Sequence, residues 1–431
     1  MTNPVWKIFT SLRLTVALLA LSVLLVFFGT LAQVDQGLWR AQEVWFRSLL
    51  VHGQKLRLFN WHFMVPIFPG GYLIGYTLLA NLTGAFIKRF EWRREKIGIH
   101  FVHSGVILLL LGQLLTDLLS QESHLQLKEG QTKNYSEAHR RNELVFARDA
   151  TPGQEEVVAI PETLLRPGAR LQQEKLPFEV RVAQYGSNCE VRRRGPAIDG
   201  PSPATQGAGA QLVVEPRAES TDMDSRNIPY AYIELVKGGE NLGTWLVTPW
   251  LSIFGVAPQE VVVDGGTFRA DLRFERYYKP FSVALLNATH EIYRGTDIPK
   301  NFRSRVRIEN PASSETREVD IYMNHPLRYA GLTFYQYQMG RDEVDKSRGT
   351  STLQVVKNPG WLAPYAGCYI VAIGMYVQFR LHLTRFLGRR LGGENASRRA
   401  GRWGPITGRL LEAGLLGYVV LKFSFKLFGY A

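Results

Sequence analysis

Two histidines open an otherwise apolar segment of the chain, EKIGIHFVHSGVILLLLGQLLTDLL, at positions 100 and 103. Ionisable side chains are rare inside membrane-spanning segments and usually serve a function there. On an α-helix, residues three apart point about 60° from each other and differ in height by about 4.5 Å, so His100 and His103 share one face. The two axial ligands of a haem iron face each other. At most one of these histidines can therefore bind a given iron.

The depth of the pair is compatible with a haem site. Both histidines lie within two helical turns of a basic cluster that ends at Lys96, which places them in the cytoplasmic third of a membrane. Haem made in the cytoplasm would pass this depth on its way out. A flat apolar porphyrin suits a bilayer site, with imidazole on the iron and nearby cations for the propionates. The second histidine could hydrogen-bond a propionate or a backbone carbonyl.

The chain does not supply a convincing imidazole for the other side of the iron. His62 starts the second apolar run at the outer face, roughly 30 Å away across a bilayer. His382 lies at the interfacial inner end of the last run. A second subunit would have to provide the ligand. Two alternatives remain open: histidines that only pack helices, and a proton relay, which is disfavoured because Asp117 stands alone at the outer end.

Four apolar runs are candidates to cross a membrane. They cover about residues 12–32, 63–86, 97–119 and 361–379. The first is too long for the apolar core of a cleaved signal peptide. The prolines and glycines of PIFPGGYLIGY predict a kink or a late helix start in the second. Basic loops after the second and fourth runs predict a cytoplasmic N-terminus and an outer location for the block between runs three and four.

That block is predicted to be β structure. Segments such as FEVRVAQY, AYIELVKG and REVDIYMN alternate apolar and polar residues between turn-forming residues. The predicted fold class is a membrane protein with about four transmembrane α-helices and a large extracytoplasmic all-β, sandwich-like domain between spans three and four. Within it, the low-complexity residues 195–210 are predicted to form a mobile surface loop without an assigned function.

The predicted organisation has four parts. Residues 1–119 form a membrane domain with three helices, and residues 120–357 form the extracytoplasmic β-rich domain. Residues 358–385 form the fourth transmembrane helix, and residues 386–431 form a basic cytoplasmic tail. In that tail an interfacial amphipathic helix is favoured over a fifth span.

Composition argues against several classes of function. The net charge of +13 comes from Lys and Arg clusters beside apolar runs, so it indicates membrane topology and not nucleic-acid binding. The two cysteines, Cys189 and Cys368, form no CxxC motif, which argues against a dithiol redox role or a structural zinc site. Cys368 lies in an apolar run and is predicted to be a small buried hydrophobe.

A series of short motifs occurs in a fixed order toward the C-terminal end. They are Pro-Lys-x-Phe-x-Ser (Pro299, Lys300, Phe302, Ser304), Met-Asn-x-Pro-Leu (Met323, Asn324, Pro326, Leu327), Phe-Tyr-Gln (Phe334, Tyr335, Gln336) and Asn-Pro-Gly (Asn358, Pro359, Gly360). With the first apolar run and the His-x-Gly of the third, they resemble the ResB (CcsB) family of System II cytochrome c biogenesis. Residues 195–210 and the tail depart from the family pattern.

The resemblance implies a function. A ResB-type chain would be a subunit of the System II cytochrome c synthase complex, a multi-pass protein of the bacterial cell (inner) membrane. It would take part in haem transport across the membrane and in covalent haem attachment to apocytochrome c. The implied cofactor is haem b, as transported substrate and transient ligand.

The resemblance also implies partners. They are a CcsA/ResC-type membrane protein with a tryptophan-rich haem-handling loop, apocytochrome c, thiol-reducing proteins of the same pathway, and membrane lipid. No Trp-Trp-Asp-type segment occurs in this chain. The chain therefore corresponds to the ResB half alone, a component of a haem lyase complex that is not expected to be an enzyme by itself.

Site residues follow from the same resemblance. In the family a histidine of the third span is implicated as an axial ligand of transmembrane haem, and FVHSGVILLLLGQ aligns best at His103, with His100 second. The run NHPLRYAGLTFYQYQM could line a haem or partner surface, but alternating aromatics more often pack in sheets. His325 is the position there that could bind a ligand. The competing hypothesis is a membrane-anchored scaffold whose outer domain binds a partner protein, with His100 and His103 only packing helices.

Overall fold

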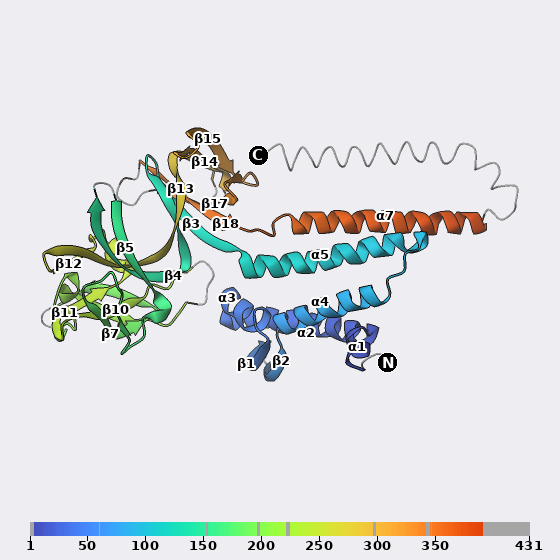
Figure 1. The fold of residues 1–431 in the computed structure, drawn as a ribbon, viewed down its shortest axis with the longest axis horizontal. Helices are drawn as coiled ribbons and strands as arrows, with labels where there is room; N and C mark the ends of the chain where they lie inside the picture. Colours follow the sequence, from blue (N-terminus) through green and yellow to red (C-terminus); the bar gives the residue numbers. More distant parts are fainter. Residues whose placement is uncertain are drawn as a thin grey trace.

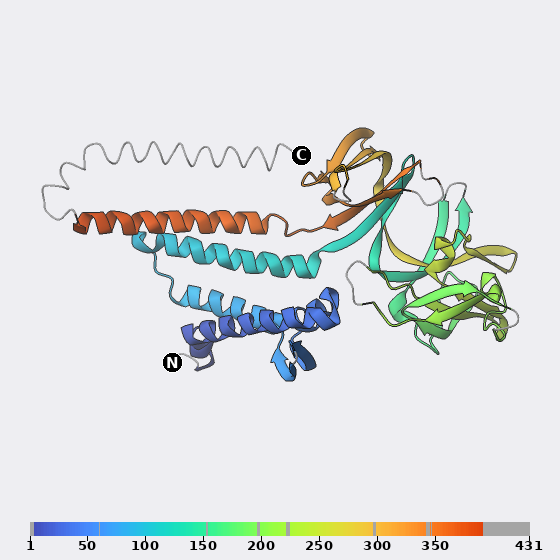
Figure 2. The same ribbon diagram turned by 180° about the vertical axis from the view of Figure 1, so that it is seen from behind.

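The computed structural model of the protein describes residues 4–59, 61–151, 154–195, 199–220, 225–295, 299–341, 345 and 347–390. Long helices extend from one side of a large β domain (Figure 1), and the reverse view shows the same arrangement (Figure 2). The helices are α1 (Pro4–Phe9), α2 (Leu12–Gln36), α3 (Leu38–Ala41), α4 (Gly71–Lys88), α5 (Ile97–Leu119), α6 (Pro249–Ile253) and α7 (Ala363–Arg390), and a π-helical turn (Gln42–Phe46) continues α3.

A buried amide joins α4 to the start of α2. Ser11 caps α2 by accepting a hydrogen bond from the backbone N–H of Arg13. Asn81 of α4 is fully buried beside this cap; its amide donates to the carbonyl of Phe9 at 2.5 Å and its Oδ1 accepts from the hydroxyl of Thr15 at 2.6 Å. A buried amide with both of its groups satisfied fixes the position of α4 along α2.

The second apolar run begins as a strand and not as a helix. β1 (Leu50–Leu58) and β2 (Trp61–Pro69) form an antiparallel hairpin, and α4 starts only at Gly71. The prolines of this run lack the backbone N–H that a helix interior needs, whereas a two-stranded hairpin tolerates them on its free edges. The predicted late helix start is therefore found. His62, expected at a helix end, lies instead on the hairpin.

Two of the described helices are long and apolar enough to cross a membrane. They are α2 and the segment Arg94–Leu119, which contains α5. Neither α4, which has 18 residues, nor α7, which carries basic residues over its second half, meets the same criterion. Membrane character thus rests on two helices.

Helices α5 and α7 pack closely along a line of glycines. On α5 these are Gly98, Gly105 and Gly112, and on α7 and its approach they are Gly360, Gly367 and Gly374, each set spaced by seven residues. A Cβ atom at Gly105 would lie 2.8 Å from the carbonyl oxygen of Gly367, and one at Gly374 would lie 2.7 Å from the backbone nitrogen of Val102. The two backbones therefore touch, as is common for small residues between membrane helices.

Strands form the remainder of the described structure, and every paired strand is antiparallel to its neighbour. The ten-stranded sheet contains β3 (Gln121–Lys128), β4 (Thr132–Thr151), β5 (Gln154–Pro161), β12 (Gln259–Val263), β13 (Gly266–Ile292), β14 (Pro299–Asn310), β15 (Glu315–Tyr322), β16 (Leu327–Tyr329), β17 (Leu332–Arg341) and β18 (Gly349–Lys357). The four-stranded sheet has the order β11 (Glu240–Val247), β10 (Tyr230–Lys237), β7 (Glu179–Gly186) and β6 (Arg170–Leu171), and β8 (Cys189–Arg193) pairs with β9 (Leu212–Pro216).

The β domain has two large apolar cores that share its longest strand, β13, and a smaller cluster around Tyr230 and Leu246. One core lies between β4, β5, β12 and β13 of the large sheet and β7, β10 and β11 of the smaller one, so two sheets face each other as in a sandwich. The other core is enclosed by β3, β13, β14, β15, β17 and β18. The prediction of a large β-rich domain is confirmed.

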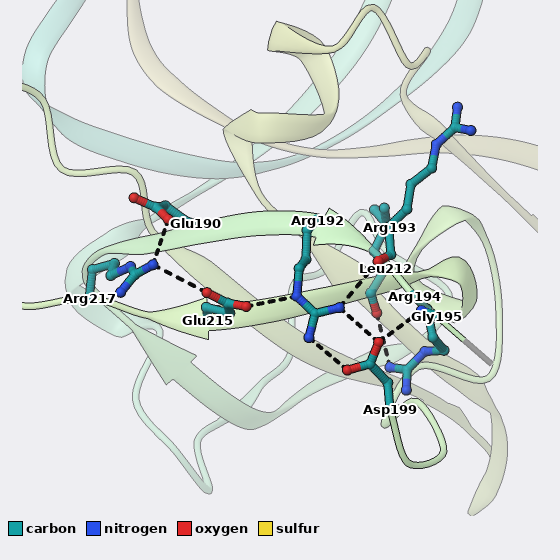
Figure 3. A network of polar contacts seen from close by, with 9 residues as sticks. All are labelled: Glu190, Arg192, Arg193, Arg194, Gly195, Asp199, Leu212, Glu215 and Arg217. Carbon is teal, nitrogen blue, oxygen red and sulfur yellow. Dashed lines mark hydrogen bonds and ion pairs between the residues drawn. The ribbon is translucent and has the colours of Figure 1, made fainter. Parts of the chain in front are cut away.

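The stretch predicted to be a mobile loop is instead anchored over residues 199–210. Arg192 of β8 binds both carboxylate oxygens of Asp199 at 2.8 and 2.7 Å and also Glu215 of β9 at 2.7 Å (Figure 3). Ala204 is buried, and Gly209 packs against Leu246. These contacts fix the stretch on the domain surface. Residues 196–198 lie outside the described residues.

Two further predictions concern α7 and the tail. Cys368, predicted to be buried, is exposed, because Gly367 faces α5 and the next side chain points about 100° away from that contact. The predicted interfacial helix in the tail falls within residues 391–431, outside the described residues.

We predict that Gly105→Ala destabilises the protein. The added carbon would lie 2.6 Å from Cγ2 of Val371, so the helices must separate, at an expected cost of about 1–3 kcal/mol. The measurement is the midpoint of thermal unfolding of the full chain in detergent. Gly75→Ala on α4 is the matched control, because its new carbon would meet no heavy atom within 4 Å. Equal effects of the two substitutions would contradict a contact that depends on glycine.

Candidate functional site

His100 and His103 lie on the face of α5 that is turned toward α4. Phe86 of α4 and Phe90, which follows it, surround them: the His100 ring lies 4.6 Å from the Phe90 ring, and the His103 ring lies 6.2 Å from the Phe86 ring and within 13° of parallel. The glycine line of α5 points about 150° away, toward α7. Packing against α7 therefore turns both histidines toward α4.

The two imidazoles have different hydrogen bonds. His103 Nδ1 lies 2.8 Å from the carbonyl oxygen of Ile99, one turn earlier on α5. Since a carbonyl only accepts, Nδ1 carries the proton and Nε2 keeps its lone pair. His100 Nε2 lies 2.7 Å from the carbonyl oxygen of Glu91, so this nitrogen is the donor. His103 therefore leaves Nε2 without a hydrogen bond and His100 leaves Nδ1, and a backbone carbonyl orients each ring.

His100 serves a different purpose in this arrangement. Its bond to Glu91 holds the connection between α4 and α5, where Glu91 also pairs with Lys96 at 2.8 Å and with Arg93 at 3.2 Å. The basic residues of this connection are thereby kept at the level where α5 begins. The side chains of Arg93 and Lys96 therefore lie near the N-terminal end of α5, the end that carries both histidines.

The structure does not bring a second histidine to His103. His62 lies on the β1–β2 hairpin, and His382 is exposed on the second half of α7. The sequences of α2 and α4 contain no histidine. Besides His100, one turn earlier on α5, the described helices α2 and α4 therefore bring no imidazole to the face of α5 that carries His103.

A polar cluster at the other end of the same helices was missed by sequence reasoning. Asp117, expected to stand alone, accepts a hydrogen bond from the hydroxyl of Tyr72 at 2.5 Å, and its other oxygen lies 3.6 Å from Nε of Arg47. Three separate segments contribute these residues, so no local pattern could reveal the cluster. The signals available in the sequence were Tyr72 near the start of one predicted helix and Asp117 near the end of another.

The family-type motifs occupy structural positions in the β domain and at its junction with α7. The hydroxyl of Ser304 is fully buried and lies 2.6 Å from Oε1 of Gln336 and 2.7 Å from Oγ of Ser351. Asn358 Oδ1 accepts from the backbone N–H of Gly360 at 2.8 Å and lies 3.3 Å from the Thr116 hydroxyl of α5. The first set joins β14 to β17 and β18, and the second fastens the ends of α5 and α7.

The aromatic run after β15 is mainly structural, as expected. Asn324 adopts a positive φ of 60° in the predicted turn, a conformation that asparagine tolerates. Phe334 is fully buried in the second core, whereas Tyr335 alternates to the outside. The ring centroids of His325 and Tyr322 lie 4.5 Å apart and the rings are stacked, so His325 forms part of this turn.

A second feature that the sequence did not suggest is a buried histidine in the β domain. His124 of β3 is 8% exposed, and neither ring nitrogen has a hydrogen-bond partner. The centroid of its ring lies 5.0 Å from that of His139 and 4.8 Å from that of Tyr337. His139 in turn accepts a hydrogen bond from Arg226. Burial, with His139 and Arg226 nearby, lowers the pKa of His124 to about 4.

We predict that the β domain loses stability as pH falls from 6.5 to 4. The pKa of His124 is lower in the folded chain than the ordinary 6.5, so the unfolded chain binds more protons in this window, and the loss reaches about 3 kcal/mol. His124→Phe should remove this part of the acid sensitivity. Thermal unfolding of the full chain between pH 7 and 4.5 measures it, with His62→Phe as the control. An acid sensitivity unchanged by His124→Phe would refute the assignment.

Part of the β domain is similar to known proteins. Residues 249–348 match the model of the ResB-like family. A segment of 113 residues, 26% of the chain, is 30% identical to Protein NrfI of Wolinella succinogenes, and 97 residues, 22% of the chain, are 31% identical to the cytochrome c biogenesis protein Ccs1 of Rhodomonas salina. The chain spans 12% and 20% of the length of these two relatives. The predicted resemblance is confirmed, since residues 249–348 are similar to the ResB-like family.

Proposed function

We propose that the chain is a subunit of a System II cytochrome c synthase complex, which carries haem across the bacterial cell membrane and attaches it to apocytochrome c. The family match and the similarity to a protein named for cytochrome c biogenesis support a role in that pathway. The two apolar helices support a place in the membrane. Haem transport is proposed from the geometry at His103.

The observation that carries the proposal is the hydrogen bond from His103 Nδ1 to the carbonyl of Ile99. It fixes the ring on its own helix and directs the lone pair of Nε2 away from the backbone. A bound haem b would supply the iron, and His103 would be its axial ligand from this chain. His100 holds the α4–α5 connection, whose cations suit propionates.

The opposite ligand is proposed to come from a CcsA/ResC-type partner. His100 shares the face of His103 and cannot lie on the opposite side of the same iron, and the described helices α2 and α4 contain no histidine. An incomplete ligand set would allow haem to be held in the complex and released from it again. The partner would then lie against the α4 side of α5.

The β domain is proposed to stand outside the membrane, with four helical spans in total. Both of its connections run into helices, since β3 follows α5 after Ser120 and β18 leads into α7. It would hold apocytochrome c or brace the partner. Thioether formation needs reduced cysteines, and Cys189 and Cys368 of this chain lie in different parts of the fold. Thiol-reducing proteins would supply that chemistry.

We predict that His103→Ala abolishes haem retention. The chain is co-expressed with a CcsA/ResC-type protein and purified, and the Soret band per protein should fall by at least about tenfold. Added imidazole should restore the band, because it replaces the lost ligand. His100→Ala should lower it less, since its role is to hold the connection.

His382→Ala is the control for loss of an exposed helical histidine. A Soret band that persists in the His100→Ala, His103→Ala double variant would rule out a haem role for the pair. The competing scaffold function would then be supported.

The topology is tested by cysteine labelling. Both native cysteines are replaced by serine, and Arg93→Cys and Glu240→Cys are introduced singly at exposed positions. A membrane-impermeant maleimide should label Glu240→Cys in intact spheroplasts and Arg93→Cys only after lysis. Labelling of both before lysis, or the reverse order, would contradict the proposed orientation.

A further inference from the structure

A cleft of about 650 Å³ opens between α2, α4 and α5 on the side of the helices nearest the β domain. It lies on the same face of α5 as His103, because Leu110, Leu114 and Asp117 follow that residue at helical spacing. Asp117 is about 21 Å farther along the helix axis. The cleft is therefore separate from the histidine site.

The cleft has an apolar part and a polar end. Leucine, valine and isoleucine side chains line its length. At its polar end, Asp117 accepts a hydrogen bond from Tyr72 and forms an ion pair with Arg47. The amides of Gln33, Gln42 and Gln113 also line it and make no side-chain hydrogen bond within the described residues. Uncommitted amides beside an apolar slot suit a ligand with both a polar head and an apolar tail.

The charges at the polar end select an uncharged head. Arg47 is shared between Glu43 at 2.9 Å and Asp117 at 3.6 Å, so two carboxylates face one guanidinium. A phosphate or a propionate would add another negative charge next to Asp117. A neutral head that both donates and accepts hydrogen bonds meets the carboxylate and the amides without this repulsion.

The shape of the wall selects a flat head. The rings of Tyr72 and Tyr76 are stacked 5.5 Å apart and within 10° of parallel, and both residues line the cleft. Gly75 also lines the cleft and leaves space beside the two tyrosines, since a Cβ atom at this position would meet no heavy atom within 4 Å. An aromatic ring can lie against this wall with its substituents toward Tyr72 and Asp117.

We propose that this cleft binds a lipid-soluble quinone or quinol. Its ring lies on the Tyr72–Tyr76 wall, its oxygens bond to the amides and to the Tyr72–Asp117 pair, and its apolar tail follows the slot between the helices. The site is independent of haem at His103. The proposal concerns binding: the oxygens of both redox forms can accept from the amides, and the quinol O–H can also donate to Asp117.

The test uses the full chain in lipid nanodiscs with an azido-benzoquinone probe and decylubiquinone as competitor. Light-induced labelling, mapped by mass spectrometry, should fall on α2, α4 and α5 segments that line the cleft and should be competed away. Gly75→Leu fills the slot and should reduce labelling by more than about tenfold. Gln113→Leu should weaken competition by about three- to tenfold through the lost hydrogen bond.

Ala80→Leu is the matched control on an exposed position of α4 and should leave labelling unchanged. Thermal unfolding of each variant shows whether it is folded. If Gly75→Leu does not fold, Gln113→Leu still tests the proposal. Labelling spread over the lipid-facing surface, or equal labelling of Gly75→Leu, would overturn the proposal. Competition by excess phosphatidylethanolamine or by haem would assign the cleft to lipid or to haem instead.

His103→Ala separates this site from the proposed function. Quinone labelling should persist in that variant even where the Soret band is lost. Loss of labelling together with the Soret band would show a single haem-dependent site and would also overturn the proposal.

Discussion

The backbone contact between α5 and α7 is the constraint on which most of the structure depends. Close packing of the two backbones supplies van der Waals attraction along this contact. Glycines at every seventh position let the two helices touch backbone to backbone over their length. The antiparallel pairing continues beyond the helices, since β3 follows α5 and β18 precedes α7. These two strands pair along their length, from Gln121 opposite Lys357 to Lys128 opposite Thr350. Helices and domain are joined by this one antiparallel unit.

That contact also decides which residues can act. Because α7 occupies the glycine side of α5, the opposite side is left for α4, and that side carries His103 near one end and Asp117 near the other. The positions of the His103 site and of the Asp117 cleft therefore both follow from the packing of α7 against the glycines of α5. They differ in chemistry, since one offers a neutral imidazole lone pair and the other a carboxylate held by a phenol and a guanidinium.

The β domain shows why family-type motifs need not mark a binding site. Ser304, Gln336 and Ser351 satisfy one another where the curled sheet brings β14 against β17 and β18. Asn358 and Gly360 fasten the junction with the helices. Each buried polar group would be costly if left unpaired, so such positions are constrained by folding alone. His124 is the exception, buried without partners and therefore sensitive to acid.

The sequence alone determined the elements whose signal is local. Alternating segments such as AYIELVKG predicted strands, and the third apolar run predicted a helix over Ile97–Leu119. The ordered motifs indicated a resemblance that the family match over residues 249–348 supports. Helix geometry also showed that His100 and His103 cannot share one iron.

Tertiary structure decided what depends on distant partners. The carbonyls of Ile99 and Glu91 distinguish the two histidines, Arg192 anchors the stretch expected to be mobile, and Tyr72 and Arg47 meet Asp117. These contacts join segments up to 70 residues apart. Periodicity reports only which face of an element is apolar, so it carries no information about which side chain a distant element will present there.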